Sequence, residues 1–393
     1  MPHIYLDYAA STPVDPRVER AMRPYFLKKF GNPSSLHSFG QEAMKALDDA
    51  RELVARTIGA SFREIVFTGS ATEANNLALL GALRAYRMRE RGHGDRRPKI
   101  VVSRIEHESV LETARLLERE GAEVAYLPVD TFGIVDPSLI PSLIDDRTVI
   151  VSVMAANNEV GSVQPISEVA KAVARFRKDR GTVYPLFHTD AVQAFQFLPL
   201  DVAELAADCV TISGHKIYGP KGVGALYVRD IPSLDPVFRG GGQEFGLRPG
   251  TENVALIAGF AVAAERAKQR RPETSRRLRA LLRRFWEGVR DAYPKTEING
   301  PPAADERRLP NILNVYFPGY DAQELLVRFD RGGIAVSSGS ACSSRSSTPS
   351  YVVQELSGER ERARQSVRFS IGFPTTVAEI DKAVRIIKNI LKR

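Results

Sequence analysis

Short apolar runs and longer amphipathic segments alternate along most of the chain. The short runs are rich in Val and Ile, which favours buried strands, and the segments between them carry apolar residues at helical spacing. The predicted strands are 64–68, 99–103, 123–127, 148–154, 184–188, 208–213 and 225–228; the predicted helices are 71–89, 109–120 and 167–178, with Ser167 as an N-cap. This alternation indicates an α/β fold with helices on both faces of a sheet.

The pattern changes after about residue 260. Two helices are predicted, 261–269 and 273–292, followed by a turn at 299–302, a strand at 312–317, a helix at 322–328, a Ser/Gly-rich loop at 337–350, a strand at 366–371 and a helix at 377–391. We therefore expect a large α/β domain of residues 15–260 and a small α+β domain of residues 1–14 and 261–393. Part of the segment 1–40 should pack on the small domain.

The composition is that of an ordinary globular protein, with 43% hydrophobic and 26% charged residues among 393. The longest apolar stretch, 254–264, is too short to cross a membrane. The N-terminal segment already contains the acidic residue Asp7, which is not typical of a signal peptide. Two cysteines are too few for a disulfide framework. We expect a cytoplasmic protein without a membrane partner.

The formal net charge of +8 raises the question of a nucleic-acid or acidic partner. Most basic residues are mixed with acidic ones, but 276–284 is basic without acids, and a solvated helical face is the simplest interpretation. Aromatic residues do not interleave with a basic strand, so we expect no direct contact with nucleic acid.

Lys216 is the first candidate for chemistry. It follows the apolar run 209–212 and precedes a Gly-Pro turn at 219–220, so we place it at a strand end. A desolvated lysine there could form a Schiff base with a carbonyl group. A surface lysine at a turn is the alternative.

Other polar residues also follow predicted strands, where α/β sheets bind ligands. The turn 68–73 precedes a helix and could bind an anion or simply cap the helix. Asp190 could pair with a cofactor nitrogen or act as an N-cap, and His107 could cover a ring, carry protons or be structural. Ser213 and His215 are donors next to Lys216 that would suit a phosphate group.

Many motifs in one order resemble the class V aminotransferase group of pyridoxal-phosphate enzymes, and more narrowly the cysteine desulfurases of the NifS/IscS type. The motifs are YLDYAASTPVDPRV at 5–18, GNPSSLHSFG at 31–40, FTGSATEANNLAL at 67–79, EHESVL at 106–111, NNEVGSVQP at 157–165, HTDAVQ at 188–193, SGHKIYGPKGVGALYVR at 213–229, GGGQEFGLRPGTENV at 240–254, SSGSAC at 337–342 and VRFSIG at 367–372. The resemblance covers almost the whole chain. It implies pyridoxal-phosphate transferase fold type I, with a mostly parallel seven-stranded sheet flanked by helices.

The resemblance also implies the roles of individual residues. Lys216 would hold the cofactor and later move the substrate α-proton, Asp190 would pair with the pyridinium nitrogen, and His107 would stack on the ring. Gln193 would bind the phenolic oxygen, and Asn158 and Arg368 would hold the substrate carboxylate. The residues implied for the phosphate are Ala71, Thr72, Ser213, His215 and, from the neighbouring subunit of a homodimer, Thr251. Asn158 is also expected at the cofactor.

Cys342 decides the reaction that the resemblance implies. It lies in the polar loop 337–350, where an exposed thiol suggests reactivity, whereas Cys209 lies in an apolar strand and is expected in the core. In the family this position attacks the sulfur of L-cysteine, alanine is released, and the resulting persulfide passes sulfur to an acceptor such as an iron–sulfur scaffold protein or a tRNA-thiolation enzyme. No metal site is expected, except that Cys342 could bind a cluster in complex with an acceptor.

Two alternatives remain at this point. One is a selenocysteine lyase, or another lyase or aminotransferase of the same fold; Cys342 argues against a plain aminotransferase. The other is an inactive nucleic-acid-binding or sulfur-carrier scaffold protein, which the intact Lys216, Asp190, His107 and Arg368 disfavour. The loop departs from the family pattern at Arg345 and at 347–350, which leaves the acceptor open.

Overall fold

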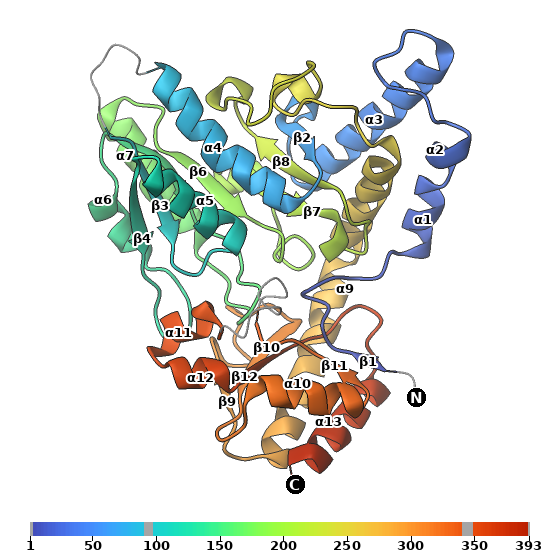
Figure 1. The fold of residues 1–393 in the computed structure, drawn as a ribbon, viewed down its shortest axis with the longest axis vertical. Helices are drawn as coiled ribbons and strands as arrows, with labels where there is room; N and C mark the ends of the chain where they lie inside the picture. The colour runs from blue at the N-terminus through green and yellow to red at the C-terminus, as the bar shows by residue number, and fades with distance from the viewer. Residues whose placement is uncertain (1–2, 90–96, 340–348, 392–393) are drawn as a thin grey trace.

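The computed structural model describes residues 3–89, 97–339 and 349–391. Its main feature is a seven-stranded sheet in the order β2-β8-β7-β6-β5-β3-β4, in which only β8 runs antiparallel to its neighbours (Figure 1). The strands are β2 (Ile65–Thr68), β3 (Lys99–Ser103), β4 (Glu123–Leu127), β5 (Thr148–Ser152), β6 (Leu186–Asp190), β7 (Cys209–Ser213) and β8 (Gly224–Val228). The predicted mostly parallel α/β sheet is confirmed.

Alternate residues of each strand enter different hydrophobic cores. Phe67 and Val151 belong to one core, which also holds residues of α3 (Ser38–Thr57), α7 (Ile166–Arg180) and α9 (Val254–Ala292). Val66 and Ile150 belong to the other, together with α4 (Ala71–Arg89) and α5 (Glu108–Arg119). Because both faces are covered, the strands are apolar throughout rather than alternating with polar residues.

The remaining strands form two smaller sheets, which lie below the large sheet in Figure 1. β9 (Glu297–Asn299), β10 (Ile312–Tyr316) and β12 (Ser366–Ser370) are antiparallel, and β1 (Ile4–Tyr5) pairs with β11 (Ile334–Ala335). The N-terminal segment therefore packs on the C-terminal part, as predicted. The other helices are α1 (Pro16–Met22), α2 (Pro24–Leu27), α6 (Ile140–Leu143), α8 (Val202–Leu205), α10 (Ala322–Arg331), α11 (Tyr351–Ser357), α12 (Arg360–Arg364) and α13 (Val377–Leu391).

The long helix α9 corrects the prediction of two separate helices. It continues through Pro272, which costs one backbone hydrogen bond and some strain. Buried residues on both sides of the proline, Ala267 and Thr274, keep the helix against the core. The predicted domain boundary at residues 260–261 falls inside α9, and the boundaries stay a prediction.

Two smaller predictions were also wrong. The helix α7 begins at Ile166 with Pro165 as its N-cap, so Ser167 lies inside the first turn. The strand expected at 184–188 begins only at Leu186, because Pro185 has no N–H to donate to a neighbouring strand.

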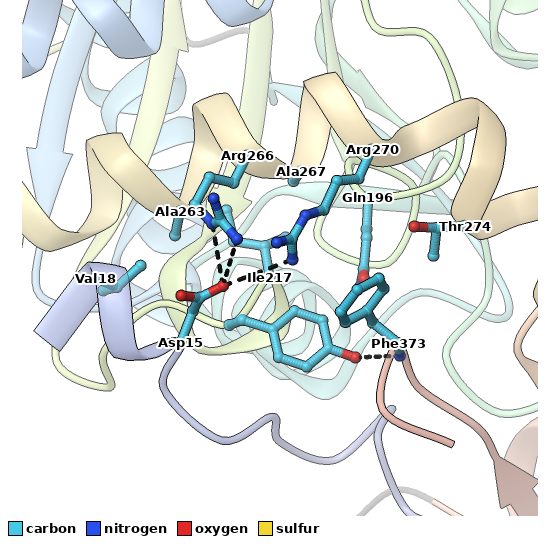
Figure 2. A pocket seen from close by; sticks show the side chains of 11 residues that line it. Asp15, Val18, Gln196, Ile217, Ala263, Arg266, Ala267, Arg270, Thr274 and Phe373 are labelled. Atoms are coloured by element: carbon cyan, nitrogen blue, oxygen red, sulfur yellow. Dashed lines mark hydrogen bonds and ion pairs between the residues drawn. The ribbon is translucent and has the colours of Figure 1, made fainter. Parts of the chain in front are cut away.

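The basic residues of α9 bind other parts of this chain. Arg277 donates to the carbonyl oxygens of Phe373 and Thr375, and Arg284 pairs with Asp381 at 2.6 Å. In the first half of α9, Arg266 pairs with Asp15 at 3.0 Å. The guanidinium of Arg270 lies 4.5 Å from the centroid of the Phe373 ring (Figure 2). The basic residues of α9 therefore bind other segments of the chain instead of forming only a solvated face.

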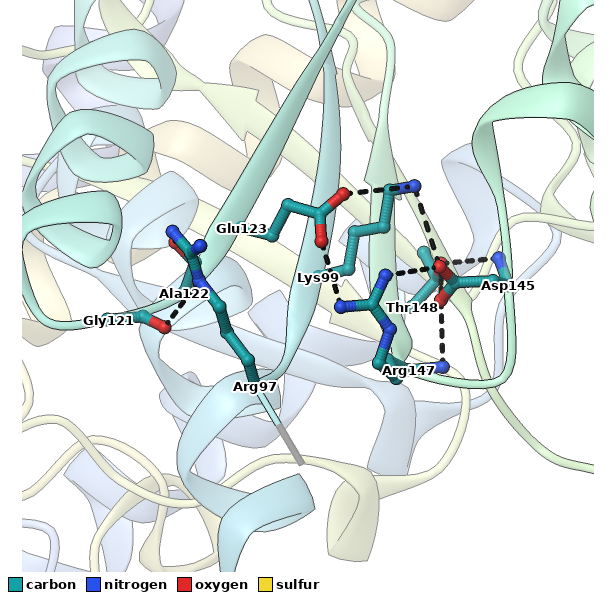
Figure 3. A network of polar contacts seen from close by, with 8 residues as sticks. All are labelled: Arg97, Lys99, Gly121, Ala122, Glu123, Asp145, Arg147 and Thr148. Atoms are coloured by element: carbon teal, nitrogen blue, oxygen red, sulfur yellow. Dashed lines mark hydrogen bonds and ion pairs between the residues drawn. The ribbon is translucent and has the colours of Figure 1, made fainter. Parts of the chain in front are cut away.

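The amino ends of β3, β4 and β5 are joined by a network of charges (Figure 3). Lys99 lies 3.3 Å from Glu123 and 3.6 Å from Asp145, and Arg147 pairs with both carboxylates. This network links the amino ends of three neighbouring strands of the seven-stranded sheet. In the ranges that the structure describes, no helix is long and apolar enough to cross a membrane.

Candidate active site

A cleft opens at the carboxyl ends of the parallel strands, where α/β sheets bind ligands. It brings together residues from seven of the quoted motifs, which are far apart in sequence. The predicted site residues that line it are Ala71, Thr72, His107, Asn158, Asp190, Gln193, Ser213, His215, Lys216 and Arg368.

One end of the cleft suits an anion. Ala71 and Thr72 begin α4, and Ser213 and His215 line the cleft with them. A Cβ on Gly224 would lie 2.9 Å from the carbonyl carbon of Ser70, so this glycine lets the first turn of α4 approach β8. The oxygen Oγ of Ser70 also accepts from the Glu73 N–H at 3.1 Å. Capping and an exposed helix N-terminus thus coexist in this turn.

Lys216 is half-buried and lines the cleft, so the interpretation as a surface lysine is wrong. Its Nζ donates to the carbonyl oxygens of Ala9 at 2.6 Å and Ala10 at 2.9 Å. Burial, and secondarily the nearby Lys216, lower the pKa of His215 to about 4, which leaves that imidazole neutral. Sequence reasoning missed the contribution of residues 9 and 10, although they lie in the first family motif.

Asp190 ends β6 with 6% of its surface exposed. Its Oδ1 accepts from the Val192 N–H at 3.0 Å, and its Oδ2 accepts from Asn75 Nδ2 at 2.8 Å. These two donors fix the orientation of the carboxyl group in the cleft. Asn75 was not predicted, although it too lies in a quoted motif.

His107 is the N-cap of α5, where its Nδ1 accepts from the Ser109 N–H at 3.1 Å. His107 therefore both caps α5 and lines the cleft. Burial lowers the pKa of His107; the nearby Lys216 lowers it further, while Asp190 acts in the opposite direction.

Arg368 lies at the other end of the cleft with 1% of its surface exposed. Its Nη1 donates to the backbone oxygen of Asn158 and its Nη2 to Asp7 Oδ1, both at 2.9 Å. The expected pair of Asn158 and Arg368 is thus in contact, through the Asn158 backbone rather than its side chain. Asp7 is a further residue that the sequence did not single out.

Three buried polar atoms at the cleft have no hydrogen-bond partner among the described residues. They are Asn75 Oδ1, Asn158 Oδ1 and Arg368 Nε. Buried polar groups are nearly always paired in folded proteins, so these atoms mark places where a polar ligand fits.

Two predicted residues are not part of this cleft as described. Thr251 is exposed and does not line it. Cys342 lies outside the described residues, although the described ends of its loop lie close to the site. Ser337 exchanges backbone hydrogen bonds with Arg368, and Ser350 Oγ donates to Glu159 Oε2 at 2.5 Å. Cys209 is fully buried, as predicted.

Comparisons with known proteins identify the family of this chain. The model of the aminotransferase class-V family matches residues 4–383. The chain is 42% identical to the cysteine desulfurase IscS of Rickettsia typhi over 98% of this chain and 90% of that protein, and 41% identical to the putative cysteine desulfurase IscS 1 of Bacillus subtilis over the full length of both. A solved structure described as a NifS-like protein superposes with a TM-score of 0.89 at 35% identity, covering 99% of both chains.

The chain therefore belongs to the aminotransferase class-V family, whose members bind pyridoxal phosphate. Within that family it is a cysteine desulfurase of the NifS/IscS type. The cleft fits this cofactor, because an anion site, a carboxylate and a lysine amine all face the same space.

Proposed function

We propose that the cleft converts L-cysteine to L-alanine and that Cys342 accepts the sulfur. The observation that carries this proposal is the anchoring of both described ends of the cysteine loop beside the cleft. Ser337 pairs with the backbone of Arg368, and the hydroxyl of Tyr351 donates to the backbone oxygen of Glu106. A structure described as SspA in complex with cysteine, 35% identical to this chain with a TM-score of 0.78 and covering 93% of it and 98% of that chain, supports cysteine as the substrate.

The residues of the cleft would have separate roles in binding the cofactor and in moving the substrate proton. Ala71, Thr72, Ser213 and His215 would bind the phosphate. Asp190 would bind the ring nitrogen, Gln193 would bind the phenolic oxygen, and His107 would stack on the ring. Pyridoxal phosphate, when bound, supplies an electron sink for bond breaking at the substrate α-carbon. Lys216 would hold the cofactor covalently and then take the α-proton. The carbonyl oxygens of residues 9 and 10 accept hydrogen bonds from Lys216 Nζ and help to position this amine.

Arg368 would bind the substrate carboxylate, because its bonds to Asn158 and Asp7 leave guanidinium N–H groups without a partner among the described residues. The thiolate of Cys342 attacks the substrate sulfur, the carbon–sulfur bond breaks, and a proton replaces sulfur on the β-carbon. The products are alanine and a persulfide on Cys342. An acceptor such as an iron–sulfur scaffold protein or a tRNA-thiolation enzyme would then take the terminal sulfur.

A homodimer would complete the site. Phe30, Leu36 and Phe39 are 66%, 92% and 51% exposed, and they lie in the segment around α2 and the start of α3. Such an apolar patch is typical of an interface. A neighbouring depression connects Met44 of α3 with Glu252, next to Thr251. A second copy on this patch would therefore meet Thr251, in line with its proposed role at the partner's phosphate.

The experiment compares alanine formation from L-cysteine, with a thiol reductant, in the parent protein, Cys342→Ala and the control Cys209→Ala. Cys342→Ala should stay yellow with bound cofactor but lose alanine formation by a factor on the order of 10³ or more, because the nucleophile is missing. Cys209→Ala should stay active because that thiol is buried in β7. Equal alanine formation by all three proteins would show that Cys342 is not the sulfur acceptor.

A further inference from the structure

A chain of buried hydrogen bonds connects Asp190 with His107 through two residues outside the proposed mechanism. Asn75 Nδ2 lies 2.8 Å from Asp190 Oδ2 and 2.8 Å from Ser109 Oγ, and Ser109 Oγ lies 2.9 Å from His107 Nδ1. Asn75 is fully buried on α4, and Ser109 is 8% exposed on α5. Side chains from two helices thus join two groups at the proposed cofactor site.

The positions of the protons in this chain follow from its donors and acceptors. If the Asn75 amide were turned around, its Oδ1 would face Asp190 Oδ2 and two acceptor oxygens would meet. The Asn75 Nδ2 hydrogens therefore point to Asp190 Oδ2 and to Ser109 Oγ.

The Ser109 hydroxyl then has one proton of its own to donate, and His107 Nδ1 is the acceptor within reach. The backbone N–H of Ser109 donates to the same nitrogen at 3.1 Å. Two donors converge on His107 Nδ1, so this nitrogen carries no proton.

We propose that Asn75 and Ser109 are positioning residues that orient the Asp190 carboxylate and hold His107 as the neutral tautomer with its proton on Nε2. In this state His107 presents an N–H donor at Nε2, and its Nδ1 is not available as a base. The inference rests on the proposed roles of Asp190 and His107 at the cofactor. The lowered pKa of His107, caused first by burial, agrees with a neutral ring.

A merely structural bridge between α4 and α5 is the competing explanation, and ring nitrogen spectra separate the two. The probe is the full-length holoenzyme with 15N in the imidazole rings of its six histidines, assigned with His107→Gln. At neutral pH the parent should show an unprotonated Nδ1 and a protonated Nε2 for His107. A protonated Nδ1 in the parent overturns the proposal.

The variants Ser109→Ala and Ser109→Thr form a matched pair, since threonine keeps the hydroxyl. The alanine variant keeps the backbone N–H donor of residue 109 but loses the hydroxyl donor, so Nδ1 should carry the proton in a larger fraction of molecules than in the parent. The His107 Nδ1 signal should therefore move toward the protonated value, and the threonine variant should restore it. The control Thr113→Val removes a different buried hydroxyl from α5 and should leave the His107 signals unchanged.

Asn75→Leu tests the other end of the chain. It should raise the dissociation constant of pyridoxal phosphate by about tenfold or more, because a hydrogen bond to a charged group is lost. Unchanged nitrogen spectra in Ser109→Ala together with an unchanged cofactor dissociation constant in Asn75→Leu would overturn the positioning role. If Asn75→Leu does not fold, the serine pair decides. Because neither readout needs turnover, a failure of the proposed sulfur chemistry is recognised separately.

Discussion

Glu106 lies one residue before His107, and its carboxyl group is fully buried. Oε1 accepts from Ser103 Oγ and from the Met154 N–H, both at 2.6 Å, while Oε2 has no partner among the described residues. Burial, with a smaller contribution from Asp190, raises the pKa of Glu106 to about 8 despite these two hydrogen bonds. The carboxyl group is therefore mostly protonated at neutral pH.

This pKa has a consequence for stability. Between the ordinary carboxyl pKa and 8 the folded protein keeps a proton that the unfolded chain releases, so rising pH favours unfolding. Glu106→Gln removes this term while keeping the shape of the side chain. The free energy of unfolding of the variant relative to the parent should rise with pH between about 5 and 8, by up to about 1.4 kcal/mol per pH unit.

Denaturant unfolding at several pH values measures this difference. Glu118→Gln, an exposed change on α5, serves as the control and should give a nearly constant difference across the same range. A constant difference for Glu106→Gln as well would mean that Glu106 is ionised in the folded protein.

At the scale of the elements, one buried ion pair joins α3 and β2 to the segment that carries Glu244. Arg51 of α3 binds both carboxylate oxygens of Glu244 at 2.7 Å and the backbone oxygen of Ile65 in β2 at 2.5 Å. The same carboxylate accepts from the Phe67 N–H at 2.8 Å. The pair thus holds the loop that leads to Thr251 against the large sheet.

Arg51→Leu would leave the carboxylate of Glu244 buried without its partner. Breaking a buried pair in this way costs about 3–5 kcal/mol, so a strong fall in the free energy of unfolding is expected. Lys45→Ala removes an exposed ion pair of the same helix, with Asp49, and should change stability very little. Denaturant unfolding of the two variants tests this; equal stabilities would show that the buried pair contributes nothing net.

Element boundaries show where local patterns stop being informative. Apolar spacing alone predicted α13 with its observed bounds and β5 with two residues too many at its carboxyl end, because both elements are short-range patterns of burial. α9 was not predicted as a single helix, because a proline normally ends a helix and only packing on both sides of Pro272 keeps it continuous.

At the scale of the whole molecule, the exposed patch around α2 and α3 predicts the quaternary structure. Leu27→Glu combined with Leu36→Glu places charges at two side chains that are 83% and 92% exposed, so the monomer should fold normally. We expect the parent to sediment with the mass of two chains and the variant to dissociate more readily. The variant should also bind pyridoxal phosphate more weakly, because Thr251 of the neighbour would be lost.

Val183→Glu is the control, since it charges an exposed apolar side chain outside the patch. It should leave the sedimentation of the parent unchanged. A parent that sediments as a single chain, or a double variant that remains dimeric with normal cofactor binding, would contradict this interface.

The sequence by itself determined the class of fold, the family and most of the residues that meet in the cleft. This was possible because strand burial is encoded by local apolar runs and because the site residues stand in recognisable motifs at strand ends. Lys216 and Asp190 were candidates from their places after predicted strands, whereas Arg368 was named only through the family resemblance.

Only the tertiary structure decided which partners these residues have. The carbonyl oxygens of residues 9 and 10 at Lys216, Asp7 at Arg368, and the link from Asp190 through Asn75 and Ser109 to His107 join segments far apart in sequence. A hydrogen bond between such segments forms only when the donor–acceptor distance is correct to within a few tenths of an ångström. Local pattern does not contain those distances, because they result from how the sheet, its helices and the N-terminal segment pack together.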